Sequence, residues 1–207
     1  MNPDKTLAMV PADTLVVLDF ETTGLSPNMG DRAIEIGAVK LERGQVIDRF
    51  SQLMNPGFRV SRFIEDYTGI SNAMLAEAPS CAEVMSQFAQ FIDGCNLVAH
   101  NASFDKRFLD AELDYIGSGY SGEFVCSLLV ARRLYPEAPS HKLGELVAYK
   151  NLTHDGVFHR ALADSEMTAQ LWLAMLADTQ KPQLSFAQIH KLSKTPKAKV
   201  PLYLSTL

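Results

Sequence analysis

Several features that would define other classes of protein are missing from this sequence. No stretch approaches the roughly 20 apolar residues needed to span a bilayer, and Met1–Pro11 has one lysine and no long apolar run typical of a secretory signal. The three cysteines are odd in number and widely spaced, and no CxxC pair occurs, which argues against a disulfide framework or a structural zinc site. We therefore expect a cytoplasmic protein that does not act at a membrane.

Acidic residues are absent from the last part of the chain, residues 179–207, which contains five lysines. Because the whole chain has a net charge of −5, residues 1–178 carry a net charge of −10. Such an acidic body does not attract nucleic acid over its whole surface. It can still bind phosphate groups if metal cations lie between its carboxylates and the phosphate.

The apolar content, 47 % of 207 residues, is sufficient for a core, and its pattern indicates an α/β protein. Short apolar or alternating runs predict strands at 14–20, 33–41, 46–54, 96–100 and 124–127, the first three forming an antiparallel meander. Helical patterns follow from Ser61 onward, and Ser80 with Glu83 is typical of a capping box. Longer helices are predicted at 103–116 and 160–177, with shorter ones at 128–134, 142–149 and 185–192. This order favours a mixed sheet flanked by helices.

Asp19 and Glu21 are the first candidate functional residues. They are two positions apart on an extended segment, so both side chains point to the same face, with Phe20 on the other. Charges at the end of an apolar strand are costly unless they are paired or bind a metal. The alternative is that the two acids simply mark the exposed end of the strand.

Two further carboxylates lie in separate segments. Asp105 falls in the first turn of the helix that begins at Ser103, where it is either a capping residue or a functional one. Asp164 lies among small and apolar residues on a helix, where an unpaired carboxylate would destabilise the fold. His159 precedes that helix and is either a structural or a catalytic histidine. No single residue among these decides the function.

Three blocks of sequence carry a family resemblance. In chain order they are DFETTGL (19–25), VAHNASFD (98–105) and HRALADSEMTAQL (159–171). They resemble the signature blocks of the DEDDh 3′-to-5′ exonucleases, a family that includes the proofreading epsilon subunit of bacterial DNA polymerase III. Four residues separate His159 from Asp164, which is the spacing of the histidine-containing branch. The resemblance implies a ribonuclease H-like α/β fold, with three antiparallel strands first and parallel strands after them. The change in charge at residue 179 divides the chain into an exonuclease domain, residues 1–178, and a basic C-terminal tail, residues 179–207, which matches nothing in the family.

This resemblance implies a two-metal-ion phosphodiester hydrolase. Asp19, Glu21, Asp105 and Asp164 would hold two Mg²⁺ or Mn²⁺ ions, which prefer oxygen ligands. His159 would be the general base that takes a proton from the attacking water, since an ordinary histidine pKa suits that role. The protein would then remove nucleoside 5′-monophosphates from the 3′ end of DNA, with single-stranded or frayed ends favoured.

Other residues are expected to contact or shape the site of the terminal nucleotide. They are Thr22, Thr23, Gly24, Leu25, His100, Asn101 and Phe104. Phe104 is equally compatible with stacking on a base and with packing in the core.

Three alternatives remain open on the sequence. The enzyme could be an exoribonuclease that trims RNA ends, because the contact that reads a 2′-hydroxyl is not visible in the motifs. It could be a binding module without catalysis. The segment Gln183–Phe186 faintly resembles peptides that dock on a sliding clamp, so a polymerase or clamp partner is a further hypothesis, beside a solvated tail or one that guides nucleic acid.

Overall fold

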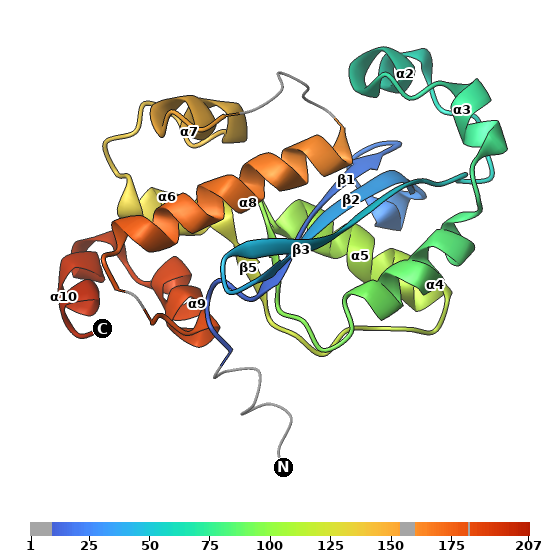
Figure 1. Ribbon diagram of the computed structural model, residues 1–207. Coiled ribbons are helices and arrows are strands. Elements are labelled where there is room, and N and C mark those ends of the chain that lie inside the picture. The colour runs from blue at the N-terminus through green and yellow to red at the C-terminus, as the bar shows by residue number, and fades with distance from the viewer. Residues whose placement is uncertain (1–9, 154–159, 182) are drawn as a thin grey trace.

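The computed structural model of the chain describes residues 10–153, 160–181 and 183–207. Its centre is a five-stranded sheet with the order β3-β2-β1-β4-β5 (Figure 1). The strands are β1 (Leu15–Thr22), β2 (Ala33–Glu42), β3 (Gln45–Leu53), β4 (Leu97–Ala99) and β5 (Phe124–Cys126). β2 pairs with β1 and with β3 in antiparallel fashion, whereas β4 runs parallel to β1 and to β5. The predicted mixed sheet is therefore confirmed.

The first strand is longer than its apolar run indicates. It continues past Phe20 to Thr22, because Glu21 still pairs with Glu35 of β2 before the register shifts between Glu21 and Thr22. A shift of this kind bends a strand and redirects the side chains that follow it. The two acidic residues therefore lie inside a paired strand and are held by its hydrogen bonds.

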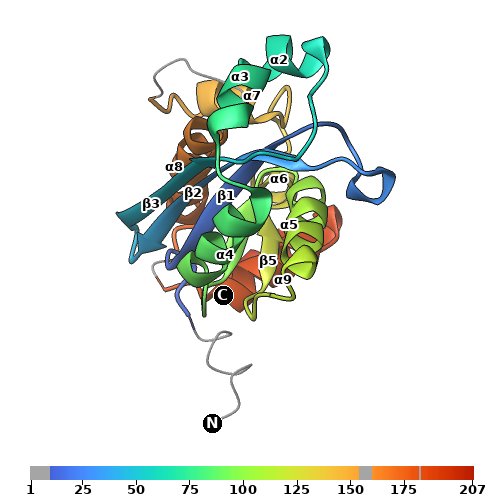
Figure 2. The ribbon, with the colours of Figure 1, turned by 90° about the vertical axis from the view of Figure 1, so that its right-hand side faces the viewer.

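Helices cover both faces of the sheet (Figures 1 and 2). They are α2 (Arg62–Thr68), α3 (Asn72–Glu77), α4 (Cys81–Phe91), α5 (Ser103–Tyr115), α6 (Ser127–Leu134), α7 (Leu143–Tyr149), α8 (Ala161–Asp178), α9 (Phe186–Lys194) and α10 (Val200–Ser205), with short 3₁₀ turns η1 (Pro27–Met29) and η2 (Lys197–Lys199). Ser80 caps α4 and forms the predicted capping box with Glu83.

The alternating side chains of β1 fill two separate cores. Val16 and Leu18 pack with α4 and α5 on one face, while Leu15 and Val17 pack with α6, α8 and α9 on the other. A strand that is covered on both faces is apolar at nearly every position. This explains the uninterrupted run that precedes Asp19.

The basic C-terminal segment is part of the second core. Phe186, Ile189 and Leu192 of α9 are fully buried, and the ring of Phe186 lies 6.2 Å from that of Trp172 on α8. The backbone N–H of Phe186 also donates to the carbonyl of Val10 at 2.9 Å. Leu184 is buried as well, so in this fold the two apolar residues of the clamp-like peptide face the core of their own chain.

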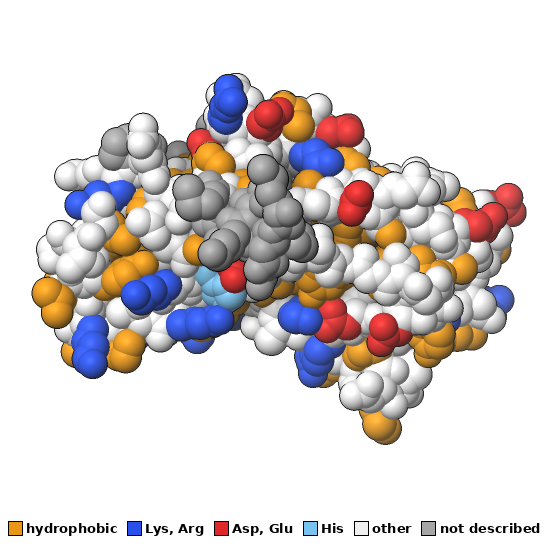
Figure 3. Space-filling view, turned by 90° about the horizontal axis from the view of Figure 1, so that it is seen from below, with side chains coloured by type: hydrophobic (Ala, Val, Ile, Leu, Met, Phe, Trp, Pro, Cys, Tyr) orange, Lys and Arg blue, Asp and Glu red, His pale blue; other side chains and the backbone are white. Residues whose placement is uncertain are grey.

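The side of the molecule that carries α9 shows Lys and Arg side chains together with apolar, uncharged and some acidic ones (Figure 3). Four lysines of the C-terminal segment are exposed: Lys191, Lys194, Lys197 and Lys199. Within the described residues, no helix has both the length and the apolar character needed to cross a membrane.

Candidate active site

Three of the predicted carboxylates meet where β1 and α8 come together. Oxygen atoms of Asp19, Glu21 and Asp164 all lie within 4.8 Å of one another. Asp19 and Glu21 share the face of β1 that is covered by α8, whereas Phe20 packs on the opposite face. Asp164 lies in the first turn of α8. The local period of a strand and the position of one helix thus account for the cluster.

Asp105 reaches the same strand from its other side. One of its carboxylate oxygens accepts a hydrogen bond from the backbone N–H of Phe20 at 3.2 Å. Since β4 ends at Ala99, this N–H lies beyond the reach of the parallel ladder, and the first turn of α5 supplies its acceptor. The fourth predicted carboxylate is therefore buried beside Asp19, although it is not among the three that meet within 4.8 Å.

Burial and mutual repulsion make this cluster hard to ionise. Loss of solvation, followed by the charge of Asp164, raises the pKa of Glu21 to about 8. Burial also raises the pKa of Asp105 to about 7. The pKa of Asp19 lies well above its ordinary value, first because of burial and then because of the neighbouring Asp105 and Asp164. Carboxylates held in this way require a positive partner to be charged together.

An ion pair that the motif analysis did not single out fixes the start of α8. Glu35 on β2 is buried and accepts hydrogen bonds from Nε and from a terminal nitrogen of Arg160, at 3.1 and 2.8 Å. Its second oxygen accepts the N–H of Ala161, the first residue of α8, at 3.0 Å. Bidentate pairs of this kind hold planar groups in a fixed orientation. Because Asp164 follows three residues later, the pair also fixes the position of that carboxylate.

Gly37 permits the close approach of α8 to the sheet. A β-carbon at this position would lie 2.1 Å from the carbonyl carbon of Ala161, which is backbone and cannot rotate away. The carbonyl oxygen of Gly37 instead accepts the hydroxyl of Ser165 at 2.8 Å. Gly37 pairs directly with Asp19 across the sheet. Because glycine has no β-carbon, α8 can approach β2 closely enough for Asp164 to reach β1.

A cleft of about 1090 Å³ opens above the carboxylates, and all seven predicted substrate residues line it. In the loop after β1, the hydroxyl of Thr22 donates to the carbonyl of Gly24 at 2.6 Å. A β-carbon on Gly24 would lie about 2.4 Å from the carboxylate of Asp31, which would have to move and lose its hydrogen bonds with Thr23 and Ser26. Leu25, at the end of the turn, is 76 % exposed.

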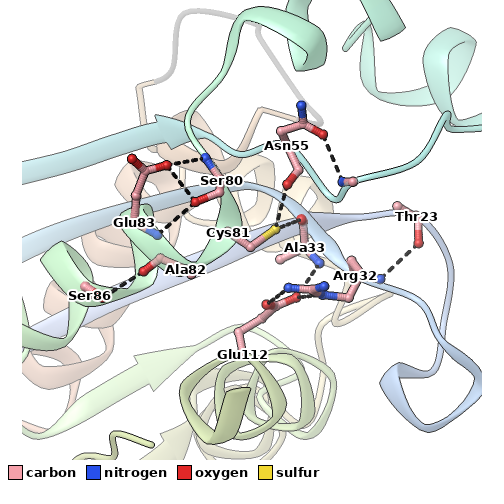
Figure 4. Close-up of polar contacts among 11 residues, drawn as sticks. Thr23, Arg32, Ala33, Asn55, Ser80, Cys81, Ala82, Glu83, Ser86 and Glu112 are labelled. Atoms are coloured by element: carbon pink, nitrogen blue, oxygen red, sulfur yellow. Dashed lines mark hydrogen bonds and ion pairs between the residues drawn. The ribbon is translucent and has the colours of Figure 1, made fainter. Parts of the chain in front are cut away.

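A partly buried ion pair anchors the same loop to α5 (Figure 4). Arg32 donates from Nε and a terminal nitrogen to Glu112, at 2.8 and 2.7 Å, and Glu112 also accepts the N–H of Ala33. The backbone N–H of Arg32 donates to the hydroxyl of Thr23 at 3.0 Å. Because α5 also carries Asp105, this contact ties the loop to one of the candidate ligands.

The remaining predicted cleft residues have different surroundings. Both ring nitrogens of His100 are engaged, one with the hydroxyl of Ser127 and the other with the carbonyl of His141, each at 2.9 Å. Burial lowers the pKa of His100 to about 4, so this ring is neutral and shapes the cleft wall. Asn101 adopts a left-handed backbone conformation. Phe104 packs 5.1 Å from Phe108 and also lines the cleft, so stacking on a base stays a prediction.

Two aromatic residues of the cleft were missed by the motif analysis. Phe63 and Tyr67 on α2 are 72 % and 52 % exposed, and their rings stack at 6.0 Å with an interplanar angle of 11°. Both line the cleft. Their spacing of four residues on a helix that follows the capping Ser61 was the available signal. His159, the predicted general base, lies outside the described residues.

Comparison with known proteins decides the family. The family model for exonucleases, RNase_T, matches residues 16–172. The chain belongs to this exonuclease family. It is 38 % identical over 169 residues to the PolC-type DNA polymerase III of Caldanaerobacter subterraneus, which covers 80 % of this chain and 12 % of that protein. It is also 38 % identical over 181 residues to the 3′-5′ exonuclease DinG of Bacillus subtilis, covering 86 % of this chain and 19 % of that protein. The chain thus spans less than a fifth of either relative.

One solved structure has the same fold over nearly its whole length. Exonuclease X, in complex with 5′ overhanging duplex DNA, superposes with a TM-score of 0.70 and 28 % identity, over 86 % of this chain and 99 % of that one. The resemblance to the DEDDh exonucleases is therefore confirmed at the level of family and fold. Members of this family use divalent metal ions, and the three clustered carboxylates are the oxygen ligands that such ions prefer.

Proposed function

We propose that this protein is a metal-dependent 3′-5′ exonuclease that hydrolyses phosphodiester bonds at the 3′ end of DNA and releases nucleoside 5′-monophosphates. The observation that carries the proposal is the meeting of Asp19, Glu21 and Asp164 within 4.8 Å beneath a large cleft. Carboxylates this close together are costly to ionise at the same time unless a cation binds between them.

The donor set suits two Mg²⁺ or Mn²⁺ ions. Asp19, Glu21 and Asp164 would hold one ion, and Asp19 with Asp105 would hold the second. Bound divalent ions stabilise the negative charge on the attacking and leaving oxygens of a phosphodiester. The Glu35–Arg160 pair and the close packing at Gly37 keep the ligands of β1 and α8 in register, so little reorganisation is needed when cations bind.

Other residues of the chain would position the substrate and move the proton. His159 would take the proton from water, as its place in the family motif implies. Thr22, Thr23, Gly24 and Leu25 would meet the terminal nucleotide, and the Arg32–Glu112 contact holds that loop against α5. Leu25 offers an exposed apolar side chain for the face of a base.

The aromatic residues of the cleft favour unpaired 3′ ends. Phe63 and Tyr67 form one exposed stack at the cleft and Phe104 contributes another apolar surface. Aromatic side chains stack on unpaired bases, whereas bases inside a duplex are already stacked on one another. DNA is favoured over RNA because the named relatives include a DNA polymerase and a nuclease solved with DNA. Trimming of RNA ends is the alternative.

A single assay separates these substrates. Matched 5′-labelled DNA and RNA oligomers, single-stranded, duplex or with a mismatched 3′ end, are incubated with the protein and Mg²⁺ or EDTA. We expect a ladder that shortens from the 3′ end on single-stranded and mismatched DNA, and none with EDTA. Asp164→Asn should lose this activity, whereas Asp93→Asn, which changes an exposed aspartate far from the cleft, should retain it. Internal cleavage, or no mononucleotide release from any oligomer, would contradict the proposal.

Association with a polymerase is a further part of the proposal, since the PolC relatives join a similar segment to a much longer chain. Leu184 and Phe186 are buried, so a clamp contact through Gln183–Phe186 would require this segment to leave the core. Co-elution of the intact protein with a replicative polymerase or with its sliding clamp would test both partners. A cytoplasmic location stays a prediction.

A further inference from the structure

Two cations line the cleft on the side opposite the aromatic helix α2. They are Arg132, on α6, and Lys142, which immediately precedes α7 (Figure 1). Both side chains are exposed, and neither forms an ion pair within the described residues. By contrast, the arginines nearest the loop after β1 and the start of α8 are each paired with a buried glutamate. We call Arg132 and Lys142 the cationic rim.

The cationic rim is held in a fixed position relative to the carboxylates. α6 begins at Ser127, whose hydroxyl oxygen lies 2.9 Å from Nδ1 of His100 and 3.3 Å from the carbonyl oxygen of Ala99, at the end of β4. The other ring nitrogen of His100 contacts the carbonyl of His141, the residue before Lys142. One partly buried imidazole therefore ties both parts of the rim to the strand that leads into Asp105.

The acidic cleft offers phosphates of the substrate few positive contacts besides these two residues. When they are ionised, Asp19, Glu21, Asp105 and Asp164 repel phosphate, and bound cations would neutralise them only near the bond that is cut. A strand that continues away from its 3′ end brings further phosphates along the cleft, each of which gains from a separate positive contact. Exposed Arg and Lys side chains without protein partners are suited to such contacts.

We propose that Arg132 and Lys142 bind backbone phosphates of the nucleotides that precede the bond to be cut. The partner is thus a single-stranded polynucleotide whose backbone follows α6 and the start of α7, with its bases towards the aromatic side of the cleft. The rim gives the enzyme its preference for an oligomer over a single nucleotide ester. This inference rests on the proposed exonuclease function.

The test compares a double variant with a matched control of equal charge. Arg132→Ala/Lys142→Ala removes the rim, and Lys194→Ala/Lys197→Ala removes two positive charges from the exposed C-terminal segment outside the cleft. Each protein is assayed on a ten-nucleotide single strand, at several salt concentrations, and on a nucleoside 5′-(p-nitrophenyl) phosphate, which has only the phosphate to be cleaved.

For the rim variant we expect the ratio of oligomer to ester kcat/KM to fall about tenfold or more, through KM. The slope of log KM against log salt should fall by about 1.4, because each phosphate contact with a single strand contributes about 0.7. The control should keep the ratio and the slope of the wild type. Arg132→Lys/Lys142→Arg, which preserves both charges, should keep the slope and guards against a fold defect in the alanine variant.

Three results would overturn the inference. They are an unchanged slope in the rim variant, an equal change in the control, or loss of slope in the charge-preserving variant. If the wild type cleaves the oligomer and the rim variant keeps the same KM and the same salt slope, this inference alone is refuted. Wild-type protein that cleaves neither substrate with Mg²⁺ or Mn²⁺ refutes the exonuclease proposal and, with it, the role of the rim.

Discussion

Replacing Glu21 with glutamine should stabilise the metal-free protein at pH 8 while weakening its response to divalent cations. Glu21 is buried on β1 beside Asp19 and Asp164, and burial raises its pKa from 4.5 to about 8. The glutamine has nearly the same shape and carries no charge. The substitution therefore removes the titration with little change in packing.

The size of the effect follows from the pKa shift. A carboxyl whose pKa is raised by folding retains its proton in the folded chain while the unfolded chain loses it, so the free energy of unfolding falls as the pH rises between the two pKa values. For Glu21 this window runs from pH 4.5 to about pH 8. At about 1.4 kcal/mol per pKa unit, the loss between pH 5 and pH 8 is roughly 3 kcal/mol. In a chain of this length that is a shift of about 6–12 °C in Tm.

The assay is thermal unfolding, followed by circular dichroism in EDTA from pH 5 to pH 8. We expect Glu21→Gln to melt above the wild type at pH 8, with a difference that closes towards pH 5. Glu77→Gln, on the exposed surface of α3, controls for the loss of one charge and should follow the wild type. Mg²⁺ should raise the Tm of the wild type and raise that of Glu21→Gln less, because the variant has lost one ligand oxygen. If the variant and the wild type show the same pH dependence in EDTA, the account of this cluster as a strained set of buried charges is refuted.

Three further substitutions test other parts of the site. Gly37→Ala should destabilise the protein by about 1–3 kcal/mol and weaken metal binding, because its new β-carbon collides with the backbone of Ala161. Gly119→Ala is the control, because a β-carbon there meets nothing within 4 Å. Equal chemical denaturation midpoints for the two variants would contradict the close-packing argument. His159→Ala should lose most turnover while Mn²⁺ still binds in calorimetry, and a near-normal exonuclease rate would remove this histidine from the mechanism. Phe63→Ala should raise KM for single-stranded DNA about 5-fold or more, since stacking on one base contributes about 1–3 kcal/mol. The same change at Phe58, which is half-exposed but outside the cleft, should leave KM as it is; matching values would show that the aromatic stack does not hold bases.

The parts of the fold that were predictable depend on short periods in the sequence. The apolar run before Asp19 is buried on both faces, and the alternation within 33–41 matches a strand of the meander. The same period places Asp19 and Glu21 on one face, so their proximity to each other could be expected from two residues alone.

Contacts between distant segments were not predictable in this way. The Glu35–Arg160 pair joins residues 125 positions apart, and neither residue is unusual in its own segment. Gly37 resembles any glycine in a strand until the backbone of Ala161 is placed against it. The aromatic pair on α2 looks like an ordinary helix face, and only the tertiary fold turns it towards the cleft. Such residues have a role only in relation to a partner that local patterns do not reveal.

The charge of the C-terminal segment did not indicate that one side of α9 is buried in the core. Its lysines are spaced so that one side of the helix meets solvent, while Phe186, Ile189 and Leu192 complete the packing around Trp172. A segment can therefore be basic in composition and still belong to the core.

This arrangement of α9 has a practical consequence for any shortened version of the protein. The match to the exonuclease family ends at residue 172, yet the apolar cluster around Trp172 continues through α9 to Val200. A boundary drawn at the end of the family match, or just after α8, would uncover that cluster and leave an aggregation-prone surface. The lysines of this segment are therefore best studied by changing single side chains in the intact chain, and an expression fragment should include α10, because Tyr203, Leu204 and Leu207 also pack against this cluster.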